Sequence, residues 1–321
     1  MGKLHISSTP HIHQKGSTTS NIMLDVVIAM IPATIVGIVI FGLKALLNVV
    51  TCVGTAVLAE YIFNLCLKKK QTIKDFSAVV TGLLLALNLS TEVPVWQCVI
   101  GSVFAIIVVK CLFGGLGKNI VNPAIASRVF MLLTFGAVGA VAKVAPLFNL
   151  EFLGNGAILE ATATPLAGLN AGASAENATV LQLFLGVHGG TIGETCAWAL
   201  LLGFGYLVAR KVIKWYVPAT YVVTVFACYF LFDGFNFVYS LQHVLAGGLL
   251  LGAIFMATDY VTTPNTNLGR VVFCIGAGLL TFAIRKFGMY PEGVSIAILT
   301  MNLLTPFIAD FTKRKTLGGV K

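Results

Sequence analysis

The chain has 321 residues, of which 57% are hydrophobic and only 10% are charged, and its mean hydropathy is +0.93. Soluble domains usually carry about 25% charged residues, so the composition excludes an ordinary soluble protein and predicts one that lies in a lipid bilayer. The net charge of +9 comes from basic residues in short loops, where such charge sets topology. We therefore expect no nucleic acid partner.

Ten apolar runs predict an all-α integral membrane protein with about ten transmembrane helices, in a single membrane domain over residues 1–321. Residues 1–21 are polar and predict a cytoplasmic N-terminal segment. The first run lacks a clear cleavage site, which indicates a retained helix and not a signal peptide. The runs cover residues 22–43, 45–67, 77–89, 95–113, 124–142, 192–209, 216–232, 240–256, 270–284 and 292–309.

Several of these runs are shorter than the roughly 20 residues that a full span needs, and two of the short ones also lead into a polar stretch. The run 77–89 continues into a polar stretch that ends at Pro94, and the run 240–256 continues into one that ends at Pro264. Short apolar segments that are interrupted by polar residues and proline are typical of discontinuous membrane helices. We therefore expect two broken helices.

The two broken segments resemble one another. Thr-Gly-Leu-Leu-Leu-Ala at 81–86 matches Gly-Gly-Leu-Leu-Leu-Gly at 247–252, and each is followed by Ile-Gly and, nine residues after that glycine, by Lys110 or Arg285. Residues 122–127 match 290–295. The predicted spans give opposite directions to the two segments, so we expect inverted repeats at 77–135 and 240–309, with ligand sites at their interface. Chance similarity within low-complexity membrane sequence is the alternative.

The basic residues predict the orientation. With the N-terminus inside, all but four of the 21 Lys and Arg residues fall inside or at inner helix ends, which predicts cytoplasmic N- and C-termini in the inner membrane. The long loop 143–191 then lies outside. A loop of this length is usually functional, and disorder is the alternative.

Ionisable residues in apolar runs are costly and suggest function. Asp25 and Glu60 are candidates for an ion path, with structural pairing to a neighbouring helix as the alternative. Glu194 lies near the outer end of the sixth run. The seven cysteines contain no Cys-X-X-Cys pair, so we expect no metal site, iron–sulfur cluster or disulfide framework.

Two polar segments are candidate binding loops. The glycine-rich stretch 114–124 opens a helix, whose first N–H groups can hold phosphate or polarised oxygens, and Arg128 follows one turn later. The stretch 259–270 is dense in hydrogen-bonding groups and suits a planar polar ligand. A capped helix and a self-satisfied helix break are the alternatives.

These segments together resemble the family of membrane proteins that includes RnfD of the Rnf ferredoxin:NAD oxidoreductase and, more distantly, NqrB of the sodium-pumping NADH:quinone reductase. The resemblance covers essentially the whole chain. It implies a flavin-carrying electron-transfer subunit that works with the flavin protein RnfG and with the iron–sulfur and membrane proteins RnfA, RnfB, RnfC and RnfE, and that is not catalytic alone. The similarity rests on residues 7–11, 114–124, 163–166, 193–194, 258–270 and 290–293.

The resemblance also implies the cofactors. FMN would be joined through its phosphate to Thr164, in the motif Ala-Thr-Pro-Leu at 163–166. Thr162 remains an alternative, because Ala161 and Thr162 depart from the family motif. A second, non-covalent riboflavin is expected against the broken-helix loops. The candidate residues for flavin binding besides the two threonines are Arg128, Asn119, Asn122, Asp259, Thr262, Thr263 and Asn267.

The resulting hypothesis is electron transfer coupled to Na⁺ or H⁺ translocation, with the flavin carrying the electrons. A channel or secondary transporter for a small solute is the rival hypothesis, because inverted repeats and broken helices are typical of transporters. A structural protein that has lost its flavin is a third.

Overall fold

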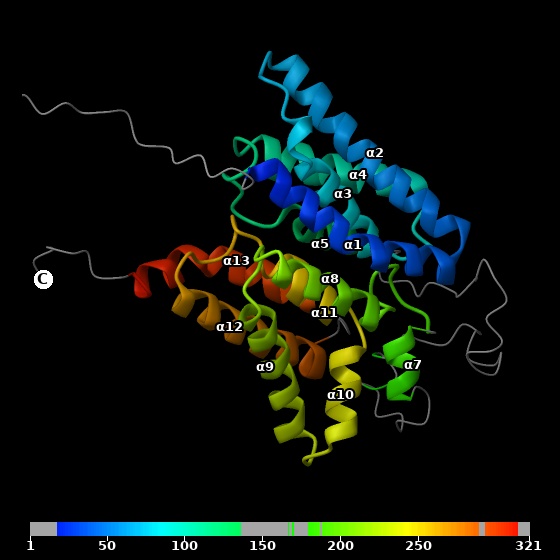
Figure 1. Cartoon of the computed structure of the whole chain (residues 1–321), viewed down its shortest axis with the longest axis vertical. Coiled ribbons are helices and arrows are strands. Elements are labelled where there is room, and N and C mark those ends of the chain that lie inside the picture. The colour runs from blue at the N-terminus through cyan, green and yellow to red at the C-terminus, as the bar shows by residue number, and fades with distance from the viewer. Residues whose placement is uncertain are drawn as a thin grey trace, which may run out of the picture.

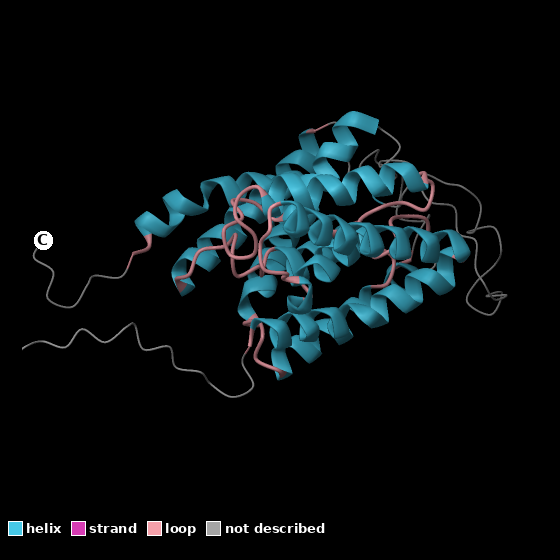
Figure 2. Cartoon of the chain, turned by 90° about the horizontal axis from the view of Figure 1, so that it is seen from above, coloured by secondary structure: helices cyan, strands magenta, loops and turns pink. Residues whose placement is uncertain are grey.

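The computed structural model describes residues 18–135, 166, 169, 179–186, 188–288 and 293–313. Every regular element in these ranges is helical, as Figure 2 shows, so the all-α fold is confirmed. The elements are α1 (Thr19–Phe41), α2 (Leu43–Cys66), η1 (Ile73–Asp75), α3 (Ser77–Leu87), α4 (Val95–Val103) continued by η2 (Phe104–Cys111), α5 (Pro123–Phe135), α7 (Val180–Leu185), α8 (Ala197–Ala209), α9 (Tyr216–Phe232), α10 (Phe237–Leu245), α11 (Leu249–Leu251) continued by η7 (Gly252–Met256), α12 (Asn267–Phe287) and α13 (Val294–Phe311).

Each of the ten predicted apolar runs coincides with one of these helices or helix pairs. The bounds differ mainly where capping residues lengthen a helix. The side chain of Thr266 accepts a hydrogen bond from the N–H of Gly269, so α12 begins three residues before its apolar run. The run 192–209 is helical only from Ala197, because the residues before it bond to another part of the chain.

Helix length limits how many spans the structure establishes. In the described ranges, α1, α2, α12 and α13 are each long and apolar enough to cross a membrane. The pair Phe237–Leu245 and Leu249–Met256 is bent by 66° and makes a fifth candidate if it counts as one broken span. Five further apolar helices have only 10–17 residues. The lengths fit a multi-pass membrane protein, and the count of ten spans stays a prediction.

The helices form two halves that meet along a central seam (Figure 1). In the first half α2 packs on α3 and α4, and in the second half α9 and α13 pack on α12. Helix α8 lies against α1, and α5 meets α13 across the seam. The leucines beside the first helix break, Leu87 and Leu89, are fully buried. The core therefore follows the line where the two broken helices face one another.

The basic residues gather at one end of the bundle, which we call the basic end. The hydroxyl of Ser20 at the start of α1 donates to the carbonyl of Lys74, and Arg210 after α8 pairs with Asp25. Lys214 donates a hydrogen bond to Asn267 at the start of α12. Because these contacts join the loops at residues 67–76 and 210–215 to the first turns of α1 and α12, most of the described Lys and Arg residues share one end.

Candidate functional site

A cavity with about 730 Å³ of empty volume lies at the basic end, between the two halves of the bundle. This volume includes space that is open to solvent. Two walls are apolar, and two polar segments that the sequence singled out meet across it. The residues that line it include Ile22, Val26, Ser77, Val80, Thr81, Leu84, Lys110, Asn119, Asn122, Leu207, Phe255, Thr258, Asp259 and Tyr260.

The first polar wall is the start of α5. The side chain of Asn122 accepts hydrogen bonds from the N–H groups of Ala124 and Ile125, at 3.0 and 3.4 Å, and Pro123 follows as the first helical residue. Asn119 is 8% exposed, and its side-chain oxygen has no hydrogen-bond partner among the described residues. A buried acceptor that lines a cavity without a partner fits a polar ligand.

The second polar wall is the turn after α11. The carboxylate of Asp259 accepts from the N–H of Val261 and the hydroxyl of Thr262, at 3.2 and 3.1 Å. Thr263 donates to the Asp259 carbonyl. The turn thus satisfies its own polar groups, as one of the sequence alternatives had it, while Asp259 still lines the cavity.

The structure brings together only part of the predicted riboflavin set. Asn119, Asn122 and Asp259 share the cavity. Thr262 is buried behind it, and Thr263 lines a neighbouring cavity. Asn267 is exposed at the start of α12, where its oxygen accepts from Lys214 at 2.6 Å.

A second group of charges, the central charge cluster of Arg128, Glu194 and Arg285, lies between the two helix breaks. None of the three is more than 4% exposed. Arg128 donates to Asn88 in the first break at 2.7 Å and to Ser295 on α13 at 3.1 Å, so this buried guanidinium has oxygen partners.

Gly247 in the second break closes this cluster. Its φ is +80°, and a Cβ atom there would lie 2.9 Å from Arg285 Nη2 and 3.2 Å from Glu194 Oε1. Arg285 in turn donates to the carbonyl of His243 at 2.7 Å. The turn after α10 therefore needs glycine both for its backbone and for the close approach of the two charges. Sequence reasoning missed that these side chains meet, since they are far apart in the chain.

Thr162 and Thr164, the predicted attachment sites, lie outside the described residues. Leu166, two positions after Thr164, is 1% exposed. Its Cδ2 lies 2.9 Å from the same Cβ position on Gly247. Further along, the carbonyl of Leu169 accepts from the hydroxyl of Tyr239 at 3.1 Å. The Ala-Thr-Pro-Leu motif thus ends at a residue that is buried beside the central charge cluster.

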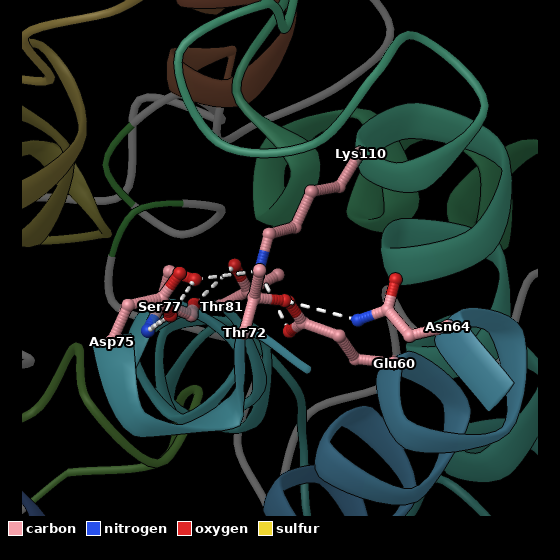
Figure 3. A network of polar contacts seen from close by, with 7 residues as sticks. All are labelled: Glu60, Asn64, Thr72, Asp75, Ser77, Thr81 and Lys110. Atoms are coloured by element: carbon pink, nitrogen blue, oxygen red, sulfur yellow. Dashed lines mark hydrogen bonds and ion pairs between the residues drawn. The ribbon is translucent and has the colours of Figure 1, made fainter. Parts of the chain in front are cut away.

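Glu60 belongs to a buried polar network on the first half (Figure 3). Lys110 donates to Glu60 at 2.8 Å and to the hydroxyl of Ser77 at 2.6 Å. Thr72 donates to the other oxygen of Glu60, and Ser77 donates to Asp75. Lys110 also lines the cavity. The sequence signal that could have revealed this ion pair is the position of Lys110 inside the apolar run 95–113.

Asp25 is held at the basic end of α1. It accepts from the hydroxyl of Tyr206 at 2.9 Å and from Arg210 at 3.3 Å. Asp25 and Glu60 are both ion-paired, as the structural alternative had it, and the ion path stays a prediction.

Comparison with known proteins identifies the family. Residues 5–318 match the model of the NQR2, RnfD, RnfE family. The chain is 45% identical over 99% of its length, and 96% of the relative's, to the D subunit of the Na(+)-translocating ferredoxin:NAD(+) oxidoreductase complex of Acetobacterium woodii. It is 38% identical over 98% of its length, and 96% of the relative's, to the D subunit of the proton-translocating ferredoxin:NAD(+) oxidoreductase complex of Clostridium ljungdahlii. It is 34% identical to the D subunit of the ion-translocating oxidoreductase complex of Shigella dysenteriae, over 98% of this chain and 99% of the relative. This chain therefore belongs to the NQR2, RnfD, RnfE family.

Proposed function

We propose that this chain is a membrane electron-transfer subunit of an ion-translocating ferredoxin:NAD oxidoreductase complex, and that it acts only together with the other subunits of that complex. The observation that carries the proposal is the match, over at least 98% of the chain, to three D subunits of ion-translocating oxidoreductase complexes, two of which are named as ferredoxin:NAD(+) oxidoreductases. The test is deletion of the gene. Membranes from the deletion strain should lose ferredoxin-dependent NAD reduction and the linked ion uptake, and a plasmid copy should restore both.

The first proposed cofactor is FMN, bound by a phosphoester to the hydroxyl of Thr164, with Thr162 as the alternative. The burial of Leu166, two residues after Thr164, beside the central charge cluster supports this. Arginine guanidinium groups are good partners for anions. The two arginines would hold a negatively charged group, and the buried leucine would fix the direction of the chain.

Intact mass of the purified protein tests the attachment. The wild-type chain, made together with a flavin transferase, should be heavier by FMN less one water. Thr164→Ala should abolish the addition and Thr162→Ala should keep it. If the addition survives Thr164→Ala and is lost in Thr162→Ala, the assignment to Thr164 is wrong.

The second proposed cofactor is a non-covalent riboflavin in the 730 Å³ cavity. Its apolar walls suit a flat aromatic ring system, and the unpartnered oxygen of Asn119 is ready to accept a hydrogen bond from a ring N–H. Asn122 and Asp259 would hold polar edges of the ligand. Thr262 and Thr263 would act indirectly by fixing the turn at Asp259.

Flavin content tests this site. Asn119→Leu should lower the non-covalent flavin released on denaturation without changing the covalent flavin. Asn267→Ala is the matched control, since that residue lies outside the cavity, and it should leave both flavins unchanged. Wild-type protein with only one flavin per chain would contradict the proposal.

We further propose about ten spans with both termini cytoplasmic in the inner membrane, and inverted repeats at 77–135 and 240–309. The clustering of Lys and Arg at one end supports the orientation. Two similar contacts support the repeats. Lys110 bonds to the hydroxyl of Ser77, and its match Arg285 bonds to the carbonyl of His243. Ser77 and His243 each lie four residues before the matched segments at 81–86 and 247–252.

The rival proposal is a channel or secondary transporter for a small solute. The 66° bend of the second broken helix and the buried acids favour it. The colour of the purified protein distinguishes the flavin carrier from the transporter. A yellow protein whose band fluoresces in a denaturing gel supports the flavin carrier, and a colourless chain that moves a solute alone supports the transporter.

A further inference from the structure

A second cavity, with about 750 Å³ of empty volume, lies beside the first at the basic end. Three of its lining side chains are cationic, namely Lys211, Lys214 and Arg270, and no acidic residue lines it in the described part of the chain. The rest of its lining is Val212, Ile213, Val217, Thr258, Tyr260, Thr263 and Asn265.

Local structure brings the three cations together. After α8 ends, Lys211 takes the left-handed conformation with φ +58°, and its N–H bonds to the carbonyl of Val208 at 3.0 Å. This tight turn carries the chain back across the end of α8 toward α12. Lys214 then donates to Asn267 at 2.6 Å, and Arg270, one turn into α12, donates to the carbonyl of Pro264 at 3.1 Å.

These partners leave the positive charge in place. An amide oxygen and a peptide carbonyl are neutral, and among the described residues no ion pair joins any of the three cations to a carboxylate. Three uncompensated cations around one hollow attract an anion with several oxygens, and phosphate is the group that Lys and Arg recognise most commonly in this way.

An apolar track runs along the outer face of α12, on the other side of the helix from Arg270. Leu268, Val272, Ile275 and Leu279 are exposed on α12 at spacings of four, three and four residues, which places them on one face of the helix. Trp215, between the lysines and α9, is 65% exposed. Tryptophan favours the level of the lipid headgroups. The basic end therefore offers cations at headgroup depth, next to helices whose outer surfaces are apolar.

We propose that this cavity binds the phosphate of an anionic phospholipid, whose acyl chains lie against the apolar outer surfaces of the helices around it. Free phosphate shares the headgroup chemistry but gains nothing from these apolar surfaces. The proposal depends on the chain lying in a membrane, and it is independent of the flavin assignments.

Native mass spectrometry of the full chain in detergent tests the site, with phosphatidylglycerol, phosphatidylcholine and inorganic phosphate titrated separately. Wild type should bind phosphatidylglycerol at least tenfold more tightly than the other two. The triple variant Lys211→Gln, Lys214→Gln, Arg270→Gln should bind it about 100-fold more weakly, at roughly fivefold for each cation lost.

The matched control is the triple variant Lys68→Gln, Lys69→Gln, Lys70→Gln. It removes the same charge from an exposed loop at the same end, and it should change binding less than twofold. Arg270→Lys keeps the charge and should retain most of the affinity, so a folding defect in the first triple variant does not hide the result.

Three outcomes would overturn the proposal. Equal weakening by both triple variants would mean that only general surface charge attracts the lipid. Phosphatidylcholine binding as tightly as phosphatidylglycerol would remove the role of the cations. Inorganic phosphate binding as tightly as the lipid would make this a free-phosphate site.

Discussion

Replacing Lys110 by methionine tests the buried pair with Glu60. The two side chains are 2% and 3% exposed and 2.8 Å apart. Removing one partner of a buried ion pair leaves an uncompensated charge and costs about 3–5 kcal/mol. Methionine keeps most of the lysine volume, so little of this cost would come from a cavity. We expect Lys110→Met to lower the free energy of unfolding by about 3–5 kcal/mol.

The double variant Lys110→Met, Glu60→Gln separates charge from packing. A neutral replacement of a buried pair is often close to neutral in stability, and a glutamine oxygen can still accept from Thr72. We therefore expect the double variant to lose at most about 2 kcal/mol, far less than the two single losses combined.

Reversible unfolding in mixed micelles with increasing dodecyl sulfate measures these differences. The pair of Asp310 and Lys313 is the control, because its side chains are 67% and 74% exposed, and Lys313→Met should cost less than about 1 kcal/mol. A loss below about 1 kcal/mol for Lys110→Met, or a double variant whose loss equals both single losses combined, would refute the reasoning.

Single contacts give three further predictions. Gly247→Ala should lower the free energy of unfolding by at least about 2 kcal/mol in the same assay, because the backbone there is left-handed and two charged side chains crowd the Cβ position. The control is Gly205→Ala on α8, where a Cβ atom meets open space, and it should be neutral or stabilising. Tyr206→Phe removes the 2.9 Å hydrogen bond to the carboxylate on α1 and should cost about 1 kcal/mol; no loss would mean that Arg210 alone holds that carboxylate. In sealed inverted vesicles, an impermeant thiol reagent should label the exposed Cys66 and leave the buried Cys98 unmodified, and labelling of Cys66 only in right-side-out vesicles would reverse the orientation.

The helices could be predicted from the sequence because a run of apolar residues is a local property. In the described residues all ten runs contain helix, and the first break fell where polar residues were expected to interrupt it. The second break was misplaced, because the chain bends at residues 246–248, inside the apolar run 240–256 and ahead of the polar stretch that ends at Pro264. The need of Arg128 for an oxygen partner was also readable, since a buried guanidinium must bond to something. Its partner Ser295 was not, because that contact joins α5 to α13 across 167 residues of the chain.

The candidate cavity was predicted only in part for the same reason. Asn119, Asn122 and Asp259 lie in loops whose polarity marked them, and the packing of the two halves brought them together. Asn267 has the same composition signal, but it is one residue past Thr266, whose side chain caps α12. It therefore begins a helix and accepts a hydrogen bond from Lys214. Composition marks a polar loop, and the turn geometry decides which of its members face a ligand.

The first helix break depends on a part of the chain that is made much later. The N–H groups of Ile192 and Gly193 donate to the carbonyls of Leu89 and Leu87, at 3.1 and 2.8 Å. Until those donors leave the ribosome, about 100 residues after the break, the carbonyls at the end of α3 lack these partners inside the bilayer, where unsatisfied groups are costly. At typical synthesis speeds this delay lasts roughly 5–20 s, so the first half of the bundle is inserted before it can close, and its completion waits for the segment that precedes α8.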